Sequence, residues 1–137
     1  MAGCGKRILV VDEDADCQAL VEAQLQEAGY AVQTACDGVE GLDKLREQYF
    51  DAIITDCCMP GFIGHEFTGF CRIAWPDIPI ILLCGNAAFM LGHAEKVDAV
   101  ACIRKPYEAA MLLTALRLAT HPVSTEQTIF SMAEMAH

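Results

Sequence analysis

Polar and charged side chains follow several apolar runs of this chain, each at the point where the run ends. They are Asp12, Glu13 and Asp14 after ILVV, Asp56 after AIIT, Cys84 and Asn86 after IPIILL, and Arg104 and Lys105 after AVACI. Carboxylates that meet in a partly buried place repel one another, and a hard divalent cation with oxygen ligands relieves that repulsion. A lysine ammonium binds phosphoryl oxygens as a point charge. Gathered in one place, this set would form a site for Mg²⁺ and a phosphoryl group.

Asp56 is the natural nucleophile of the set, because a carboxylate can form an aspartyl-phosphate intermediate. A phosphatase of the D-x-D type does not fit, because the residue two positions after Asp56 is Cys58 and no general acid stands there. Some of these residues also have plain structural roles. Asp14 is predicted to cap the following helix, and the Pro106 that follows Lys105 favours a helix start in any protein.

The elements that must position these residues alternate along the chain. Short apolar runs predict strands, and runs with helical periodicity, caps and stop signals predict the helices between them. The predicted strands are Ile8–Val11, Tyr30–Cys36, Ala52–Thr55, Ile78–Leu83 and Ala99–Ile103. The predicted helices are Ala15–Gly29, a helix after the capping box of Asp37 and Glu40 that carries Val39, Leu42, Leu45 and Tyr49, and helices at Gly64–Ala74, Asn86–Lys96 and Tyr107–Ala119.

This alternation predicts an α/β fold with a five-stranded parallel sheet, doubly wound, and helices on both faces. Strands that are apolar throughout, without alternation, are typical of a sheet that is buried on both sides. In such a sheet, ligands bind outside the carboxyl ends of the strands. The fold would therefore bring the acidic residues and Lys105 to one edge, which is hard to explain by structural roles alone.

The composition and net charge of the chain exclude some classes of protein function. The chain has 137 residues, 54% of them hydrophobic and 20% charged, with a net charge of −10. This composition indicates one compact domain, and the acidic balance argues against direct binding to nucleic acid, which requires a basic face. No apolar run is long enough to cross a bilayer. The eight cysteines lie mostly in apolar segments of a chain without a signal sequence, which favours reduced thiols and a cytoplasmic location.

The segments ILVVDED, DAIITDCCMPG, IPIILLCGN and IRKP resemble the receiver domain of two-component response regulators, the CheY-like family. The resemblance covers about Lys6–Thr120 and implies the flavodoxin-like strand order 2-1-3-4-5. It implies Asp56 as the phospho-acceptor and Lys105 as the contact of the phosphoryl group. It also implies a Mg²⁺ cofactor held by Asp12, Glu13, Asp56 and the backbone carbonyl of Cys58, and a cis bond between Lys105 and Pro106.

The resemblance also implies the partners and the domain limits. A histidine kinase or phosphotransfer protein would donate the phosphoryl group, and a protein effector would read the output face of helix four, strand five and helix five, through which a homodimer could also form. We expect a signalling domain rather than an enzyme, with self-phosphorylation and autodephosphorylation at most. Residues 1–5 would be an arm, 6–120 the receiver domain and 121–137 a tail or linker, too short for an effector domain.

Two positions depart from the family pattern. Cys84 stands where the family usually has Ser or Thr, and a thiol is a weaker donor than a hydroxyl. Cys102 stands where the family usually has Tyr or Phe, three residues before the lysine. Both positions belong to the same conformational switch, so the readout of phosphorylation is in question, whereas the residues for phosphoryl chemistry are all present.

Two alternatives follow from these departures. The chain could be a pseudo-receiver, a binding module with one fixed conformation whose partner binding ignores phosphomimics. It could also be a thiol-based sensor that uses Cys84, or Cys57 with Cys58. Against the sensor, adjacent cysteines seldom form a disulfide without strain, and buried strand cysteines are usually inert.

Overall fold

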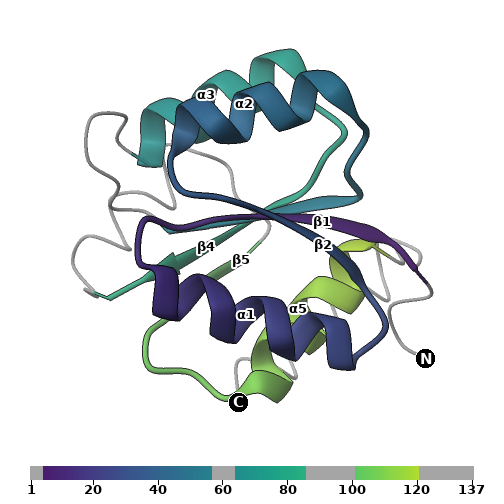
Figure 1. The fold of residues 1–137 in the computed structure, drawn as a ribbon, viewed down its shortest axis with the longest axis vertical. Coiled ribbons are helices and arrows are strands. Elements are labelled where there is room, and N and C mark those ends of the chain that lie inside the picture. Colours follow the sequence, from purple (N-terminus) through teal and green to yellow (C-terminus); the bar gives the residue numbers. More distant parts are fainter. Residues whose placement is uncertain (1–4, 57–63, 86–100, 121–137) are drawn as a thin grey trace.

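The fold is a parallel sheet between two layers of helices, seen in a computed structural model that describes residues 5–56, 64–85 and 101–120 (Figure 1). The strands are β1 (Arg7–Val11), β2 (Ala31–Ala35), β3 (Ala52–Asp56), β4 (Ile80–Cys84) and β5 (Ala101–Arg104). They pair in parallel in the order β2-β1-β3-β4-β5. The predicted fold class and strand order are confirmed.

The described helices cover both faces of this sheet. They are α1 (Ala15–Glu27), α2 (Gly38–Glu47), α3 (Gly64–Ala74) and α5 (Ala109–Thr120). Figure 1 shows α2 and α3 on one face and α1 and α5 on the other. Because all five strands run in parallel, their carboxyl ends lie together at one end of the sheet.

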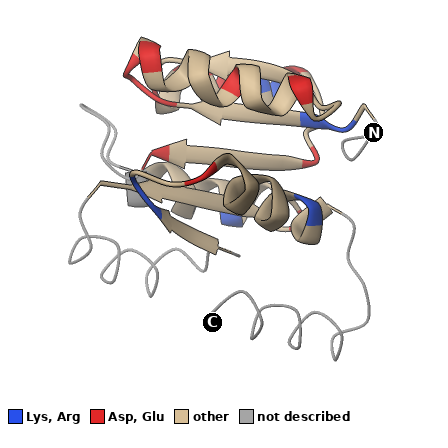
Figure 2. Ribbon diagram, turned by 90° about the horizontal axis from the view of Figure 1, so that it is seen from below, with Lys and Arg blue, Asp and Glu red and all other residues tan. Residues whose placement is uncertain are grey.

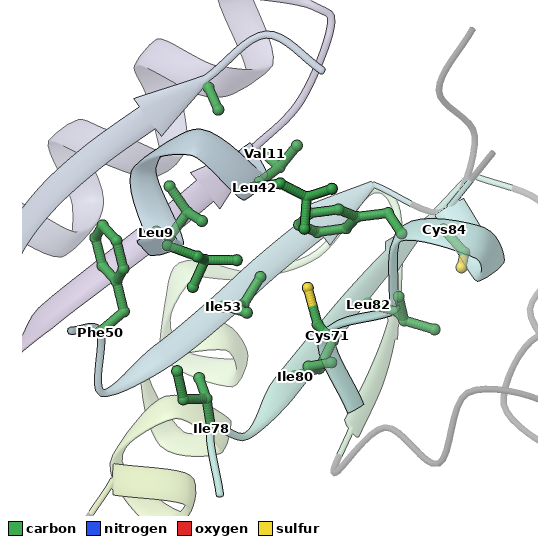
Figure 3. Close-up of a cluster of buried hydrophobic side chains, with 13 residues drawn as sticks. Leu9, Val11, Leu42, Phe50, Ile53, Cys71, Ile78, Ile80, Leu82 and Cys84 are labelled. Carbon is green, nitrogen blue, oxygen red and sulfur yellow. The ribbon is translucent and has the colours of Figure 1, made fainter. Parts of the chain in front are cut away.

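Each layer of helices encloses a separate hydrophobic core. The core under α2 and α3 contains Phe50, Phe67 and Leu82, and it extends to Cys84 at the end of β4 (Figure 3). The core under α1 and α5 contains Val21, Leu25 and other residues. Because β1, β3 and β4 are buried on both faces, their side chains are apolar at nearly every position, as predicted.

Helix α2 packs closely against the sheet at Gly41. A Cβ atom at this position would lie 3.2 Å from side-chain atoms of both Phe67 and Val11. That distance is tighter than ordinary van der Waals contact, so a larger residue would push α2 away from the strand that carries Asp12. The absence of a side chain at Gly41 thus helps to fix the distance between α2 and the end of β1.

The helix caps are largely as predicted. The side chain of Asp14 accepts hydrogen bonds from the backbone N–H groups of Asp16 and Cys17, which confirms it as the N-cap of α1. Asp37 caps α2 by accepting from the Glu40 N–H at 2.8 Å. The Glu40 carboxylate accepts from the Cys36 N–H at 3.2 Å, one residue earlier than in a standard capping box.

The predicted apolar face of α2 was wrong in part. Leu42 and Leu45 are buried, but Val39 is 58% exposed and Tyr49 is 63% exposed. The buried face of α2 consists of Gly38, Gly41, Leu42 and Leu45. Val39 is not on this face, because its side chain points in another direction around the helix. Tyr49 lies beyond the end of α2, because the backbone at Gln48 is already extended.

Other element boundaries shift by one or two residues. β4 begins after Pro79 rather than at Ile78, and the carbonyl of Pro79 accepts from the Ile53 N–H at 2.9 Å. Gly29 adopts φ 96° after the end of α1, where a residue with a side chain would be strained. The Lys105–Pro106 bond is cis, as predicted. The predicted helix at Asn86–Lys96 and the tail at 121–137 lie outside the described residues.

Candidate functional site

Three of the predicted site residues meet at the carboxyl edge of the sheet. Asp12 follows β1, Asp56 ends β3 and Lys105 follows β5. The Lys105 Nζ lies 3.6 Å from the Asp12 Oδ2 and 3.6 Å from the Asp56 Oδ2. Figure 2 shows acidic and basic positions together at this edge. The sheet therefore places one ammonium group between two carboxylates that come from different strands.

Asp12 is the most buried charged residue of this group. Only 2% of it is exposed, and its Oδ1 accepts a hydrogen bond from the Asp14 N–H at 2.9 Å. Its Oδ2 is buried, has no hydrogen-bond partner among the described residues, and faces Lys105. Burial raises the pKa of Asp12, although the bond from Asp14 and the charge of Lys105 act in the other direction. A buried carboxylate oxygen without a donor is poised to bind a cation.

Lys105 is held by the two carboxylates. Its side chain is 25% exposed. Burial by itself lowers the pKa of Lys105, but the charges of Asp56 and Asp12 outweigh it, so the pKa lies above its usual value. The lysine is therefore charged at neutral pH. It neutralises part of the repulsion between Asp56 and Asp12 and presents a positive charge to an anion that enters the site.

The remaining predicted site residues are Glu13, Cys84 and Cys58. Glu13 follows Asp12 and is exposed. Cys58 lies outside the described residues. Within residues 5–56, 64–85 and 101–120, no group of three or more His, Cys, Asp and Glu side chains is close enough to hold a metal ion. Asp12 and Asp56 are the two carboxylates that the fold brings together with Lys105.

The family model for the response regulator receiver domain matches residues 8–117. The chain belongs to this family. The matched residues run from β1 into α5 and include the whole Asp12, Asp56 and Lys105 triad. Receiver domains are signalling domains of two-component systems that interact with histidine kinases and downstream effectors, and Mg²⁺ is general to the family.

Curated relatives and solved structures agree with this assignment. The response regulator MprA of Mycobacterium tuberculosis is 33% identical over 129 residues, which are 93% of this chain and 56% of the relative. The chain thus spans about half the length of the curated relatives it matches. The chemotaxis protein CheY4 of Vibrio cholerae is 32% identical, with a TM-score of 0.78, over 84% of this chain and 98% of that one.

A third relative shows which ligands a similar receiver domain can bind. The response regulator TrrA of Thermotoga maritima, solved in complex with Mg²⁺ and BeF, is 32% identical with a TM-score of 0.77, over 83% of this chain and 98% of that one. In the receiver domain described here, the unpartnered Oδ2 of Asp12 and the nearby carboxylate of Asp56 are hard oxygen donors. This donor chemistry fits Mg²⁺.

The two cysteines that depart from the family pattern lie on neighbouring strands. Cys84 ends β4, is fully buried, and its carbonyl accepts a hydrogen bond from the Lys105 N–H at 2.8 Å. Cys102 in β5 is partly buried against the core under α2 and α3, and burial raises the pKa of its thiol. Position 84 is thus joined through the backbone to the lysine of the site.

Cys84 is also disulfide-bonded, which the sequence does not predict. The other cysteines in the described part of the chain, Cys17, Cys36, Cys71 and Cys102, are free. The composition favoured reduced thiols, and this bond is a departure from that prediction. A disulfide depends on which cysteines the fold brings within bonding reach, and the spacing of cysteines along the chain does not reveal this.

Sequence analysis missed Gln18, which lies in the first turns of α1. Its side-chain Nε2 donates to the carbonyl of Asp12 at 3.2 Å and to the carbonyl of Ala35 at 3.0 Å. A glutamine in an amphipathic helix is usually a solvated residue, so its type gives no signal. Its position, one turn after the residues that follow β1, is the feature that could have drawn attention to it.

Proposed function

We propose that this receiver domain accepts a phosphoryl group on Asp56 in a Mg²⁺-dependent reaction. The observation that supports this most is the position of the Lys105 ammonium, 3.6 Å from carboxylate oxygens of both Asp56 and Asp12. One cation between two carboxylates leaves a net negative site, which attracts a divalent cation. Together, Lys105 and that cation can balance the charge of a phosphoryl group.

Each residue has a distinct role in this proposal. A carboxylate oxygen of Asp56 attacks the phosphorus atom of a phosphohistidine, and the bond between phosphorus and nitrogen breaks. The phosphohistidine reacts with a proton on its other ring nitrogen. The bonding electrons return to the nitrogen that carried the phosphoryl group, so the histidine leaves as a neutral imidazole. Lys105 binds a phosphoryl oxygen as negative charge develops there. Asp12, Glu13, Asp56 and the backbone carbonyl of Cys58 would hold Mg²⁺, which would shield the negative charges of the carboxylate and the phosphoryl group.

The proposed partners follow from this role. A histidine kinase or phosphotransfer protein donates the phosphoryl group, and a protein effector reads the change through the face that includes β5 and α5. The receiver domain occupies residues 6–120, between an arm at 1–5 and a tail at 121–137. Cys84 and Cys102 replace the side chains of the usual switch, so we expect the response to phosphorylation to differ from that of other receivers. No described helix is long and apolar enough to span a membrane.

Incubation with acetyl phosphate and Mg²⁺ tests this function directly. Intact-mass measurement is expected to show the addition of one phosphoryl group, and Asp56→Asn is expected to show none, because an amide is not a nucleophile for this transfer. Omission of Mg²⁺ is expected to prevent the adduct. An adduct of equal amount on Asp56→Asn would contradict the assignment of Asp56.

A second candidate function is a thiol-based response, and the disulfide at Cys84 is the observation that favours it. Two cysteine thiols would each lose a proton and together transfer two electrons to an oxidised low-molecular-weight disulfide, which becomes two thiols. Cys84 lies beside the site, since its carbonyl accepts from the Lys105 N–H at 2.8 Å. The oxidation state of Cys84 would therefore affect Lys105, the proposed contact of the phosphoryl group.

Reduction of this disulfide is expected to change the rate of phosphoryl transfer from acetyl phosphate. The measurement compares the protein after treatment with dithiothreitol and after treatment with oxidised glutathione. Cys84→Thr is expected to give equal rates in both states, whereas Cys71→Ala, which alters a buried free cysteine in α3, is expected to remain redox-sensitive. Equal rates for the oxidised and reduced unaltered protein would eliminate this candidate.

A further inference from the structure

The residue Gln18 joins the ends of two neighbouring strands. Its side-chain amide nitrogen donates to the carbonyl of Asp12, after β1, at 3.2 Å and to the carbonyl of Ala35, the last residue of β2, at 3.0 Å. Both acceptors are carbonyl oxygens, so only the NH₂ end of the amide can face them. Each of the two amide hydrogens is then donated to one of these carbonyls, so Gln18 links the carboxyl ends of β1 and β2.

Asp12 has a described hydrogen-bond partner at every polar group except one, and Gln18 supplies one of these partners. The Asp12 N–H donates to the carbonyl of Ala35 at 3.0 Å, and the Asp12 carbonyl accepts from Gln18. The side-chain Oδ1 accepts from the Asp14 N–H at 2.9 Å. The remaining oxygen, Oδ2, is buried without a hydrogen-bond partner in the described part of the chain and lies 3.6 Å from the Lys105 Nζ. The peptide of Asp12 is thus fixed so that one carboxylate oxygen faces the site.

We propose that Gln18 is a positioning residue for the metal-binding carboxylate, which it orients by holding the Asp12 peptide against the end of β2. This inference rests on the proposed function, because it assigns Asp12 to the cation. Outer residues that fix the orientation of a ligand are commonly worth about ten- to a hundredfold in metal affinity. Gln18 also occupies the Asp12 backbone carbonyl with a donor, so the side chain is the group that Asp12 presents to a cation.

The test variant is Gln18→Met, which keeps the length of the side chain and removes its donors. The matched control is Gln24→Met, in the same helix, because the buried Gln24 Oε1 has no hydrogen-bond partner within the described residues. Calorimetric titration with Mg²⁺ is expected to show affinity about tenfold weaker for Gln18→Met and nearly unchanged for Gln24→Met. Gln18→Asn, whose shorter side chain cannot span both carbonyls, is expected to behave like Gln18→Met and serves if the latter folds poorly.

A second measurement reports the orientation of Asp12 without any metal. The Asp14 N–H donates to the Asp12 Oδ1, so its NMR chemical shift in the metal-free protein reports that bond. The shift is expected to change in Gln18→Met and to stay the same in Gln24→Met. Native Mg²⁺ affinity together with a native Asp14 signal in Gln18→Met would overturn the inference. Failure of the unaltered protein to bind Mg²⁺ would instead contradict the proposed metal site, and the Asp14 signal would then decide the role of Gln18.

Discussion

Replacement of Lys105 by methionine is expected to slow phosphoryl transfer from acetyl phosphate by about a hundredfold, the scale of losing one charged contact to a developing oxyanion. Lys105 is the cation whose Nζ lies 3.6 Å from both Asp12 and Asp56. Without it, an incoming phosphoryl group meets two carboxylates with one positive charge fewer. The rate is measured by intact mass over time at a fixed concentration of Mg²⁺.

The same variant is expected to be less stable at neutral pH, by about 1–3 kcal/mol for leaving a buried carboxylate without its partner. The charges of Asp56 and Asp12 hold the pKa of Lys105 above its usual value of 10.5. A base whose pKa is raised by folding stabilises the folded protein in full at any pH below its pKa in the unfolded chain. This stabilisation is lost as the pH rises through its pKa in the folded protein. Lys44→Met is the control for charge, since the Lys44 Nζ contacts only the exposed Gln33 side chain among the interactions described. Transfer by Lys105→Met within threefold of the native rate would contradict the assigned role.

Replacement of Asp12 by asparagine is expected to separate metal binding from stability. Loss of the buried carboxylate should weaken Mg²⁺ binding at least about tenfold, because a hard cation depends on charged oxygen ligands. The metal-free protein should nevertheless unfold at a higher urea concentration at neutral pH. Burial raises the pKa of Asp12, which means that its ionised form is disfavoured in the folded state relative to the unfolded chain.

The sign of the pH dependence provides a further check. Burial holds the pKa of Asp12 in the folded protein above its usual value of 3.8. The native protein therefore gains stability relative to Asp12→Asn as pH falls from neutrality through the folded pKa toward 3.8. The advantage of Asp12→Asn should shrink over this range. Asp43→Asn, which removes an exposed carboxylate paired with Arg46 at 3.2 Å, is the control. A metal-free Asp12→Asn protein less stable than the native one at neutral pH would contradict this account.

The sheet could be predicted from sequence because its strands are buried on both faces. Continuous apolar runs at β1, β3 and β4 leave few alternatives to a parallel sheet with helices on each side. Boundaries were less accurate, since they depend on single backbone groups. Pro79 delays the start of β4, and an extended backbone at Gln48 removes Tyr49 from α2. Val39 was assigned to the buried face of α2 because the spacing of apolar residues does not reveal that the glycine Gly41 lies on that face.

The charged residues of the site could be predicted because the carboxyl ends of parallel strands must meet. The order of the strands is enough to bring together Asp12, Asp56 and Lys105. Gln18 could not be predicted in the same way, because its role depends on the distances from one side chain to two backbone carbonyls. The disulfide at Cys84 likewise depends on three-dimensional proximity that the positions of the cysteines do not encode.

Reductive trapping of the phosphorylated residue tests the central claim most directly. After incubation with acetyl phosphate and Mg²⁺, borohydride converts an aspartyl phosphate into homoserine, which peptide mass spectrometry locates in the chain. The account predicts homoserine at position 56, none in protein that was not phosphorylated, and none in Asp56→Asn. Homoserine at another aspartate, such as Asp12, with Asp56 unmodified would contradict it.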